Sequence, residues 1–459
     1  MASRSIRLCG TEQREPPLRT LRAGPLRVEF DNGALRYVRI GDVEVLRGIS
    51  FLLRDENWGT MPAEITDLQV EEGAQEFCVR YRGRCRDAVR DLVYEATIRG
   101  GSDGSLAFEA VAEPLTDVLT NRTGFVVLHP VEGVAGAPVR ILHTDGSEET
   151  SCFPEAIDPR CPFKDVRAMA YEIAPGCWAT CTMEGDAFET EDHRNWTDAS
   201  FKTYIRPLAK PWPYTLPKGE KVVQSVRLSV SGPLPQAART GAGGTVAVSV
   251  GGRIGSLPKL GLGVPAAEAA FALENAGLVA SLAPRWLVCQ IDLRKGHGFA
   301  ELQTYRALGE ATGAEVALEI VTLGSMDPDG ELAGVADAAA EAGLSPAAVA
   351  AFPQQELKSY QPDQPWPQMP TFEQTYAAAR KAFPEARIGG GMAVYFTELN
   401  RKRPPSGPLD YVGHTTCPSV HAADDISVME TNEAIPYQIL STRAFMGKDI
   451  EYRIGPSQL

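Results

Sequence analysis

The chain has 459 residues, of which 44% are hydrophobic and 23% charged, so it has the composition of a globular protein and the length for two or three domains. Its 45 Lys and Arg against 59 Asp and Glu give a net charge of -14, which argues against binding to the phosphate backbone of nucleic acids. No run reaches the roughly 18 apolar residues of a bilayer span, and the N-terminus has no apolar signal core, so we expect a soluble, cytoplasmic protein without a membrane partner.

The first half has the pattern of β-strands. Short runs that alternate apolar and polar residues are separated by turn signals such as Asp31-Asn32-Gly33. Many short strands spaced about 10 residues apart predict an antiparallel β-sandwich. The clearest runs cover residues 26–30, 35–40, 77–81, 92–98, 106–112, 124–128 and 222–230.

The pattern changes after a stretch rich in Gly, Ala and Ser between Pro233 and Pro258, with Thr240–Gly244 at its centre. We therefore predict a β-sandwich domain over residues 1–240 and a second domain over residues 257–459.

Strand-length apolar runs alternate with Ala-rich segments of helical period in the second domain, which predicts a parallel sheet with helices on its faces. The predicted strands are 260–264, 286–293, 316–323, 347–352, 387–396, 409–414 and 449–454. The predicted helices are 266–276, 299–312, 332–342, 372–383 and 433–446. The prediction is a TIM-like (β/α) barrel with seven strands where a closed barrel has eight, so it can be incomplete at the C-terminus.

The first βα turn of this domain matches the dinucleotide fingerprint G-x-G-x-x-A at Gly261, Gly263 and Ala266. Pro265 removes one backbone N–H from the loop that would hold pyrophosphate, and the preceding strand is very short. A plain βα turn is therefore favoured over a nicotinamide cofactor site, and we expect no cofactor.

Polar side chains follow the predicted barrel strands at their C-terminal ends, where barrel active sites lie. These candidates are Asp292 after the second strand, Glu356 after the fourth, Glu398, Asn400 and Arg401 after the fifth, and His414 and His421 at and after the sixth. Helix caps and ion pairs are the alternative roles for such residues. His421, Glu398 and Asp424 could converge on a metal ion, but their spacing is not diagnostic of a metal site, and the nine cysteines fit no zinc pattern, so we expect no metal.

The β half contains a second candidate region between Phe188 and Tyr204, where aromatic residues alternate with both signs of charge. Arg194 and Lys202 suit an anionic or hydroxyl-rich ligand, and Trp196 suits the face of a sugar ring. A structural loop is the alternative interpretation.

Three stretches together resemble the D-apionate lactonase family. They are the segment from Glu191 to Tyr204 (EDHRNWTDASFKTY), the preceding Asn121-Arg122-Thr123-Gly124-Phe125, and the later His414–Asp425 (HTTCPSVHAADD). Members of that family open D-apionolactone in bacterial apiose catabolism. The resemblance implies an N-terminal β domain, a barrel and a further C-terminal β domain, of which we expect this chain to lack the third.

The resemblance transfers no catalytic residue, so the roles come from the chemistry of lactone hydrolysis, which needs a base, an oxyanion partner and an acid. We expect Glu398 to act as base, His414 as its acid/base partner and Arg401 in electrostatic stabilisation, with Asp292, Asn400 and His421 orienting substrate hydroxyls. The alternatives are a glycoside hydrolase using Glu356 and Glu398 as paired carboxylates, and a non-catalytic carbohydrate-binding protein.

Overall fold

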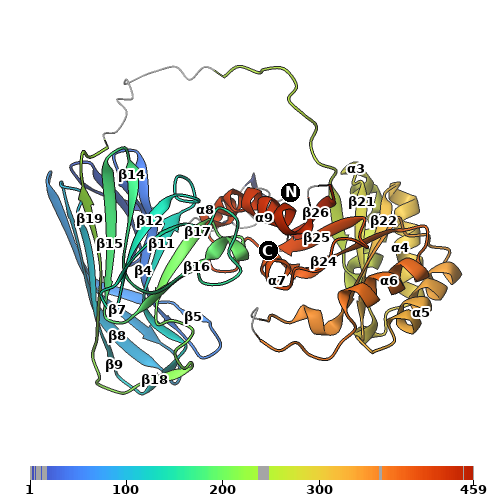
Figure 1. Cartoon of the computed structure of the whole chain (residues 1–459), viewed down its shortest axis with the longest axis horizontal. Coiled ribbons are helices and arrows are strands. Elements are labelled where there is room, and N and C mark those ends of the chain that lie inside the picture. Colours follow the sequence, from blue (N-terminus) through green and yellow to red (C-terminus); the bar gives the residue numbers. More distant parts are fainter. Residues whose placement is uncertain are drawn as a thin grey trace. The chain divides into compact units, whose positions relative to one another are not determined.

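The structure is a computed structural model and describes residues 3, 4, 6, 12, 18–235, 248–360, 364–447 and 449–457. The chain forms two compact units, the first made of Met1–Arg194 with Ala199–Val246 and the second of Asn195–Asp198 with Ala247–Leu459 (Figure 1). The segment Thr240–Gly244, predicted as the domain boundary, lies outside the described residues. Domain limits of 1–240 and 257–459 stay our proposal.

Antiparallel strands build the first unit. In the part of this unit that the structure describes, seventeen of them join in one hydrogen-bonded network, and two further strands, β10 (Val118–Thr120) and β18 (Tyr214–Leu216), pair separately. The prediction of an antiparallel β domain is confirmed, while the two-layer arrangement of a sandwich stays a prediction. The network contains β1 (Arg19–Ala23), β2 (Leu26–Asp31), β3 (Ala34–Ile40), β4 (Val43–Arg54), β5 (Thr60–Met61), β6 (Glu64–Glu72), β7 (Glu76–Arg86), β8 (Asp91–Gly101), β9 (Leu106–Pro114), β11 (Arg122–Pro130), β12 (Pro138–His143), β13 (Glu148–Cys152), β14 (Phe163–Ala174), β15 (Cys177–Glu184), β16 (Phe188–Asp192), β17 (Ser200–Ile205) and β19 (Val222–Ser231).

The burial patterns of the strands show which of them hold polar side chains inside the first unit. Strand β8 alternates between buried and more exposed positions, as expected for a strand with one face in the core. In contrast, β17 is buried at every position, and β11, with which it pairs, is buried at all but one. Polar side chains of β11 and β17 are therefore held inside the unit, where they need partners.

Within its described residues, the second unit contains a parallel sheet of seven strands in chain order, which confirms the seven predicted strands. They are β20 (Gly261–Val264), β21 (Trp286–Asp292), β22 (Glu315–Thr322), β23 (Ala348–Pro353), β24 (Arg387–Tyr395), β25 (Tyr411–Thr416) and β26 (Glu451–Ser457). A Cβ atom on Gly263 of β20 would lie 3.1 Å from Cγ of Pro456 in β26, so the first and last strands lie next to each other. The sheet thus forms a nearly closed barrel, and Gly263 permits a close approach of two strands.

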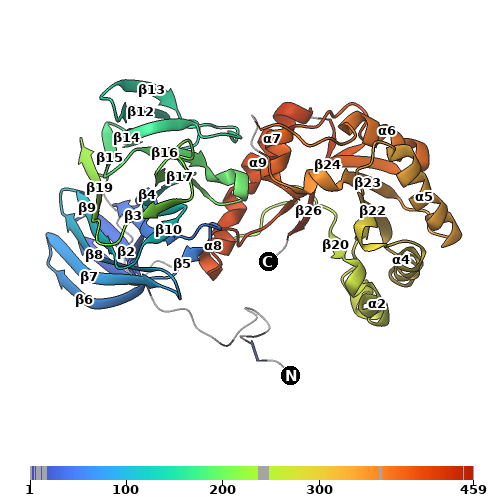
Figure 2. The ribbon, with the colours of Figure 1, turned by 90° about the horizontal axis from the view of Figure 1, so that it is seen from below.

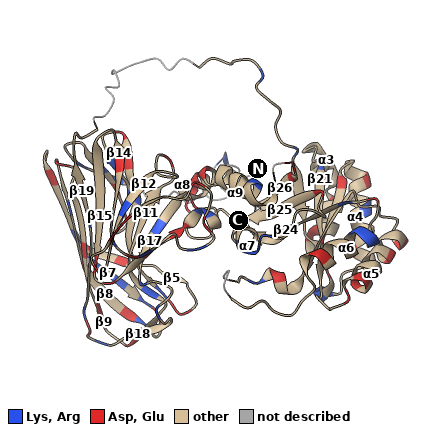
Figure 3. Cartoon of the chain, in the orientation of Figure 1, with Lys and Arg blue, Asp and Glu red and all other residues tan. Residues whose placement is uncertain are grey.

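Helices cover the outside of this sheet (Figure 2). They are α2 (Ala266–Glu274), α3 (Ala276–Ser281), α4 (Phe299–Thr312), α5 (Pro328–Glu341), α6 (Phe372–Ala382), α7 (Phe396–Lys402), α8 (Asp425–Glu430) and α9 (Ile435–Met446). Local signals set their ends: Asp327 caps α5, and Thr371 and Gln374 form a capping box at α6. Helices α4 and α6 carry both acidic and basic residues, whereas the charged residues of α5 are all acidic (Figure 3). Within the described residues, no helix has the length and apolar character needed to cross a bilayer.

Gly391 determines the close pairing of β24 with β25, directly before the site described below. Its φ is 103°, and a Cβ atom there would lie 2.1 Å from the carbonyl oxygen of Gly413. We expect Gly391→Ala to destabilise the protein by about 2 kcal/mol or more, because the substitution combines backbone strain with a forced separation of two core strands. Differential scanning calorimetry measures the effect.

Gly277→Ala is the matched control, because Gly277 lies within α3 and a Cβ atom added there would meet no other atom within 4 Å. Alanine is the better helix former, so this variant is expected to be neutral or slightly more stable. Equal unfolding temperatures for the two variants would contradict the assigned role of Gly391.

Candidate active site

The C-terminal ends of β23, β24 and β25 bring most of the predicted residues to one edge of the barrel. The 3-10 helix η3 (Gln354–Leu357) follows β23 and carries Glu356, and α7 follows β24 and carries Glu398, Asn400 and Arg401. His414 lies in β25, and His421 follows that strand. Because neighbouring parallel strands end at the same edge, one region of the molecule collects these side chains.

Residues Asn195–Asp198 come from the first half of the sequence but belong by their contacts to the second unit. Thr397 Oγ1 donates a hydrogen bond to the carbonyl of Asn195 (2.7 Å), and Asn400 Nδ2 donates to Asn195 Oδ1 (3.0 Å). Gln438 Nε2 of α9 donates to Thr197 Oγ1 (3.2 Å). Thr197 has a φ of 73°, which is unusual for a β-branched residue, so these bonds hold a strained segment in place.

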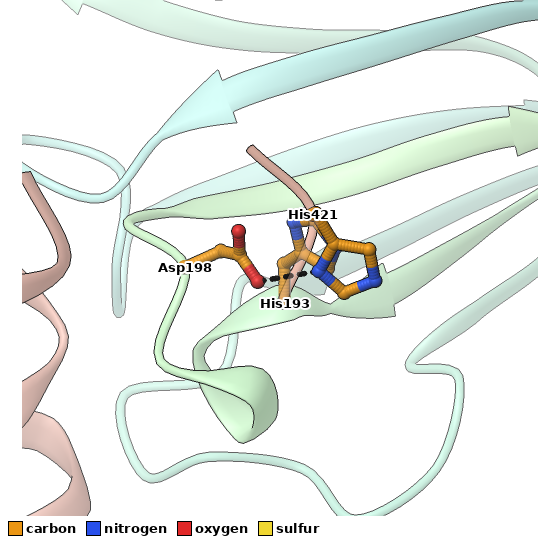
Figure 4. Close-up of side chains that lie close together, drawn as sticks. All are labelled: His193, Asp198 and His421. Carbon is orange, nitrogen blue, oxygen red and sulfur yellow. Dashed lines mark hydrogen bonds and ion pairs between the residues drawn. The ribbon is translucent and has the colours of Figure 1, made fainter. Parts of the chain in front are cut away.

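This segment positions Asp198 against His421. Asp198 Oδ2 lies 2.7 Å from Nδ1 of His421 (Figure 4), and the side chains are 20% and 19% exposed. A carboxylate at Nδ1 fixes the tautomer and the orientation of the imidazole, which is the arrangement of a histidine general base. The pair is also accessible enough to meet a small molecule.

Trp196 connects this pair to the cations of α7. Its ring lies edge to face with His421 at 6.1 Å and next to Tyr395 at 6.4 Å between centroids. The guanidinium carbon of Arg401 lies 5.6 Å from the centre of the Trp196 ring. Aromatic rings of this kind pack against the C–H face of a sugar while polar groups bind its hydroxyls.

Glu398 has both carboxylate oxygens occupied. Oε1 accepts hydrogen bonds from Ser359 Oγ (2.6 Å) and from Arg401 (3.3 Å), and Oε2 accepts from the backbone N–H of Tyr360 (3.2 Å). Lys402 Nζ lies 3.2 Å from Oε2. These contacts favour Glu398 as a positioning residue over the role of base. They leave Nε of Arg401 buried with no acceptor.

Glu356 differs from Glu398 in having few partners. It is 3% exposed, and its Oε1 is buried without a hydrogen bond. Lys402 donates to the backbone carbonyl of Glu356 (2.8 Å) rather than to its carboxylate. Burial raises the pKa of Glu356 to about 8, although the charge of Lys402 opposes this effect. The carboxyl group is therefore protonated at neutral pH and can give up a proton.

His414 is enclosed and neutral. Its Nδ1 donates to the carbonyl of Thr415 (2.9 Å), and its Nε2 accepts from the hydroxyl of Tyr452. Burial lowers the pKa of His414 to about 4. Both ring nitrogens are used within the protein, which favours a structural role over the predicted acid/base role.

Asp292 caps the short 3-10 helix η2 (Leu293–Lys295). It accepts from the backbone N–H of Arg294 (3.1 Å) and binds the guanidinium of Arg294 through both oxygens (2.9 and 2.7 Å). Hydrogen bonding to Arg294 lowers the pKa of Asp292. These contacts favour the capping alternative for Asp292 over binding of substrate.

Arg194 of the first unit is fully buried. It binds Asp192 through two hydrogen bonds (2.9 and 2.7 Å) and donates to the carbonyls of Pro154 and Glu155. Its guanidinium carbon lies 4.6 Å from the centre of the Phe201 ring. This environment favours a structural role for Arg194 over the predicted contact with substrate.

We expect Arg194→Met to lower the free energy of unfolding by about 3–5 kcal/mol, because it leaves Asp192 buried without its cation. The double variant Arg194→Met with Asp192→Leu removes both charges and is expected to regain much of that loss. Chemical denaturation of both proteins measures the difference. A double variant less stable than Arg194→Met alone would contradict this explanation.

The ring of His193 in the first unit contacts Ser200 Oγ through Nδ1 (3.2 Å) and Lys202 Nζ through Nε2 (3.1 Å), so both of its nitrogens have partners within that unit. The eight described cysteines form no disulfide.

Asp198 is the residue that sequence reasoning did not single out. It lies in the stretch Asn195–Asp198 that already stood out for its aromatic and charged residues, so the region was recognised but the residue was not. Asp198 and His421 are 223 positions apart, and no local pattern joins them.

Comparison with known proteins agrees with the sequence resemblance. The family models for the D-apionate lactonase N-terminal domain and the D-apionate lactonase TIM barrel domain match residues 6–233 and 260–459. A protein of Brucella anthropi named D-apionate lactonase is 43% identical over 455 residues, covering 98% of this chain and 74% of the relative. The chain belongs to the D-apionate lactonase family. The predicted family and enzyme class, a lactonase among the hydrolases of carboxylic esters, are confirmed, and so is the TIM-barrel class of the second domain.

Solved structures resemble parts of the chain only weakly. A galactose 1-epimerase from Lactobacillus acidophilus NCFM has a TM-score of 0.31 at 8% identity, over 48% of this chain and 97% of its own. A D-psicose 3-epimerase from Clostridium cellulolyticum H10, solved with D-tagatose, has a TM-score of 0.23 at 11% identity, over 44% of this chain and 85% of its own. Both scores are too low to transfer a site.

Proposed function

We propose that this member of the D-apionate lactonase family hydrolyses the ester bond of a sugar lactone, opening D-apionolactone or a related aldonolactone to the aldonate. The observation that carries the proposal is the pair of Asp198 and His421, which is accessible and lies beside Trp196 at the catalytic edge of the barrel. The name of the Brucella anthropi relative agrees with this substrate class. We further propose that the reaction takes place in the cytoplasm.

In the proposed reaction His421 acts as general base. Its Nε2 takes a proton from water while the water oxygen forms a bond to the lactone carbonyl carbon, and Asp198 stabilises the imidazolium through Nδ1. The carbonyl oxygen becomes an oxyanion, for which we propose the positive charge of Arg401, a side chain that is 9% exposed, as the stabilising partner.

Ring opening then breaks the bond between the carbonyl carbon and the ring oxygen. The leaving alkoxide needs a proton, and Glu356 is the buried acid at this edge that carries one at neutral pH. The aldonic acid product ionises in water, so each turnover releases one proton. The enzyme is reset when His421 loses its proton to solvent and Glu356 takes one up. Trp196 is proposed to position the sugar, while Asn400 holds Asn195 and Glu398 holds Arg401 and Lys402.

Proton release measured by pH-stat tests the proposal. Purified protein is given D-apionolactone and a panel of other aldonolactones, with the spontaneous rate subtracted, and aryl glycosides are assayed in parallel. We expect catalysed proton release from at least one aldonolactone and no release of aryl alcohol. Turnover of aryl glycosides without lactone hydrolysis would overturn the proposal in favour of a glycoside hydrolase.

A further inference from the structure

The first unit contains a buried cation, Arg122, that takes no part in the proposed reaction. Arg122 begins β11 opposite Arg54 of β4 and is 4% exposed. Its guanidinium carbon lies 3.6 Å from the centre of the Tyr204 ring and 5.2 Å from that of Trp58. The guanidinium thus stacks closely on one ring and lies near a second.

Stacking leaves the hydrogen-bond donors of Arg122 unused. A guanidinium has five N–H groups in its plane, and contact with a ring face satisfies none of them. The Nε of Arg122 is buried without an acceptor, and no side-chain hydrogen bond or ion pair of Arg122 is found among residues 18–235 or elsewhere in the described chain. A buried charge without a partner is costly, so an anion at this position would stabilise the protein.

The charged groups around Tyr204 leave the charge of Arg122 uncompensated. Lys202 lies 5.5 Å from the centre of the same ring and is paired with Glu191 at 3.0 Å. Glu189 accepts hydrogen bonds from the Tyr204 hydroxyl (2.5 Å) and from the backbone of Leu208 (2.6 Å). Both nearby carboxylates therefore have partners of their own.

The aromatic residues beside Arg122 continue to the surface of the first unit through Trp58 and Trp212. Trp58 lies 5.2 Å from Trp212 between ring centroids, and Trp212 is 49% exposed. Trp58 has a φ of 69°, a rare conformation for a bulky residue, and Arg54 donates to its carbonyl at 2.8 Å. The backbone is therefore held so that the Trp58 ring lies beside Arg122. An arginine fork next to aromatic faces suits a carboxylate attached to a polyol.

We propose that Arg122, Trp58 and Trp212 form a binding site for the carboxylate of a small polyhydroxylated acid, an aldonate. Arg122 binds the carboxylate and the two rings pack against the carbon chain. The site rests on residues of the first unit alone and is independent of the proposed lactone hydrolysis.

Isothermal titration calorimetry with sodium gluconate tests the proposal. The full-length His421→Ala protein is titrated, so that the proposed hydrolysis plays no part. Sorbitol, which has the hydroxyls without the carboxylate, and sodium sulfate, an anion without the polyol, are titrated in parallel. We expect binding of gluconate that is stronger than binding of sulfate, and no binding of sorbitol.

Single substitutions then test which residues bind gluconate. Arg122→Gln is expected to weaken gluconate binding by about 30-fold or more, because it removes one partner of a buried charge pair. Trp212→Ala alters a half-exposed residue and is expected to weaken binding severalfold without affecting folding. Arg80→Gln is the control, since Arg80 forms an exposed ion pair with Glu71 in the same unit and should leave binding unchanged.

The proposal would be overturned if Arg122→Gln and Trp212→Ala both bound gluconate as tightly as the His421→Ala parent protein. It would also be overturned if that parent protein bound no gluconate. Sulfate binding as strong as that of gluconate would identify a general anion site and overturn the assignment to hydroxy acids. If the wild-type protein opens no lactone but binds gluconate through Arg122, the lactonase proposal fails and this one stands.

Discussion

His421→Ala should lower kcat for lactone hydrolysis by about 10³-fold while changing KM little, because a general base acts mainly in the transition state. Asp198→Asn should cost about 10²-fold or more, because the amide cannot stabilise the imidazolium and permits the wrong tautomer. The double variant should be no slower than His421→Ala alone, since the two residues act as a unit. Initial rates by pH-stat over a range of lactone concentrations measure all three.

His143→Ala is the matched control for this prediction. His143 Nε2 lies 3.3 Å from Glu149 Oε2 in the first unit, so it is another partly exposed histidine paired with a carboxylate. Its removal should leave kcat unchanged. An equal loss in both histidine variants would contradict a specific role for His421.

A chelator distinguishes the two chemical roles that His421 and Asp198 can play. General-base catalysis by an imidazole should continue after dialysis against EDTA. If EDTA abolished hydrolysis and Zn²⁺ or Mn²⁺ restored it, the imidazole would be a metal ligand, and the assignment of His421 as base would be wrong.

The rate should fall as the pH rises through about 8, because Glu356 then loses the proton that the leaving alkoxide requires. Glu356→Gln should lower kcat by about 10²-fold and should remove this alkaline limb. A pH–rate profile of kcat for both proteins, with the spontaneous hydrolysis subtracted at each pH, measures the effect. An unchanged alkaline limb in Glu356→Gln would assign that ionisation to another group.

The ionisation of Glu356 should also change the stability of the protein. Here Glu356→Gln, which slows the reaction, should be favourable. The pKa of Glu356 is raised in the folded protein, so between about pH 4.5 and about pH 8 the unfolded chain has released a proton that the folded chain keeps. The free energy of unfolding contributed by this group therefore decreases as the pH rises across that window. Glu356→Gln should gain stability relative to wild type as the pH increases, as measured by thermal unfolding. Lys402 remains hydrogen-bonded to the backbone of Glu356 in this variant, so its position should be kept.

The sequence predicts the barrel well because burial on both faces leaves a clear pattern. Strand β23 (Ala348–Pro353) is a continuous apolar run buried at all six positions. Helix α4 (Phe299–Thr312) has the predicted bounds, because Glu301 caps its start and Gly313 ends it in a left-handed conformation. In the β half, the pairing of β11 with both β4 and β17 could not be predicted, since it depends on contacts between distant segments.

The positions of the candidate residues could be predicted better than their contacts. Sequence reasoning placed Glu398 and His414 at the C-terminal ends of barrel strands, where the structure has them, while their part in a site stays a prediction. Their roles depend on partners that no pattern reveals, such as Ser359 and Tyr360 around Glu398 and Tyr452 beside His414. The same limit applies to His421, which was assigned to substrate hydroxyls because its partner Asp198 lies in the other half of the sequence.

Residues Asn195–Asp198 give this protein an unusual constraint during synthesis. The ribosome makes Asp198 more than two hundred residues before His421, and the helix that binds Thr197 (Ile435–Met446) emerges later still. A nascent chain can fold its antiparallel strands early, yet Asp198 meets His421 only after more than two hundred further residues have been made. For the same reason, a gene cut at the Gly-rich segment would yield a barrel fragment without Asp198, the proposed partner of His421, and residues 195–198 would have to be supplied to it as a separate peptide.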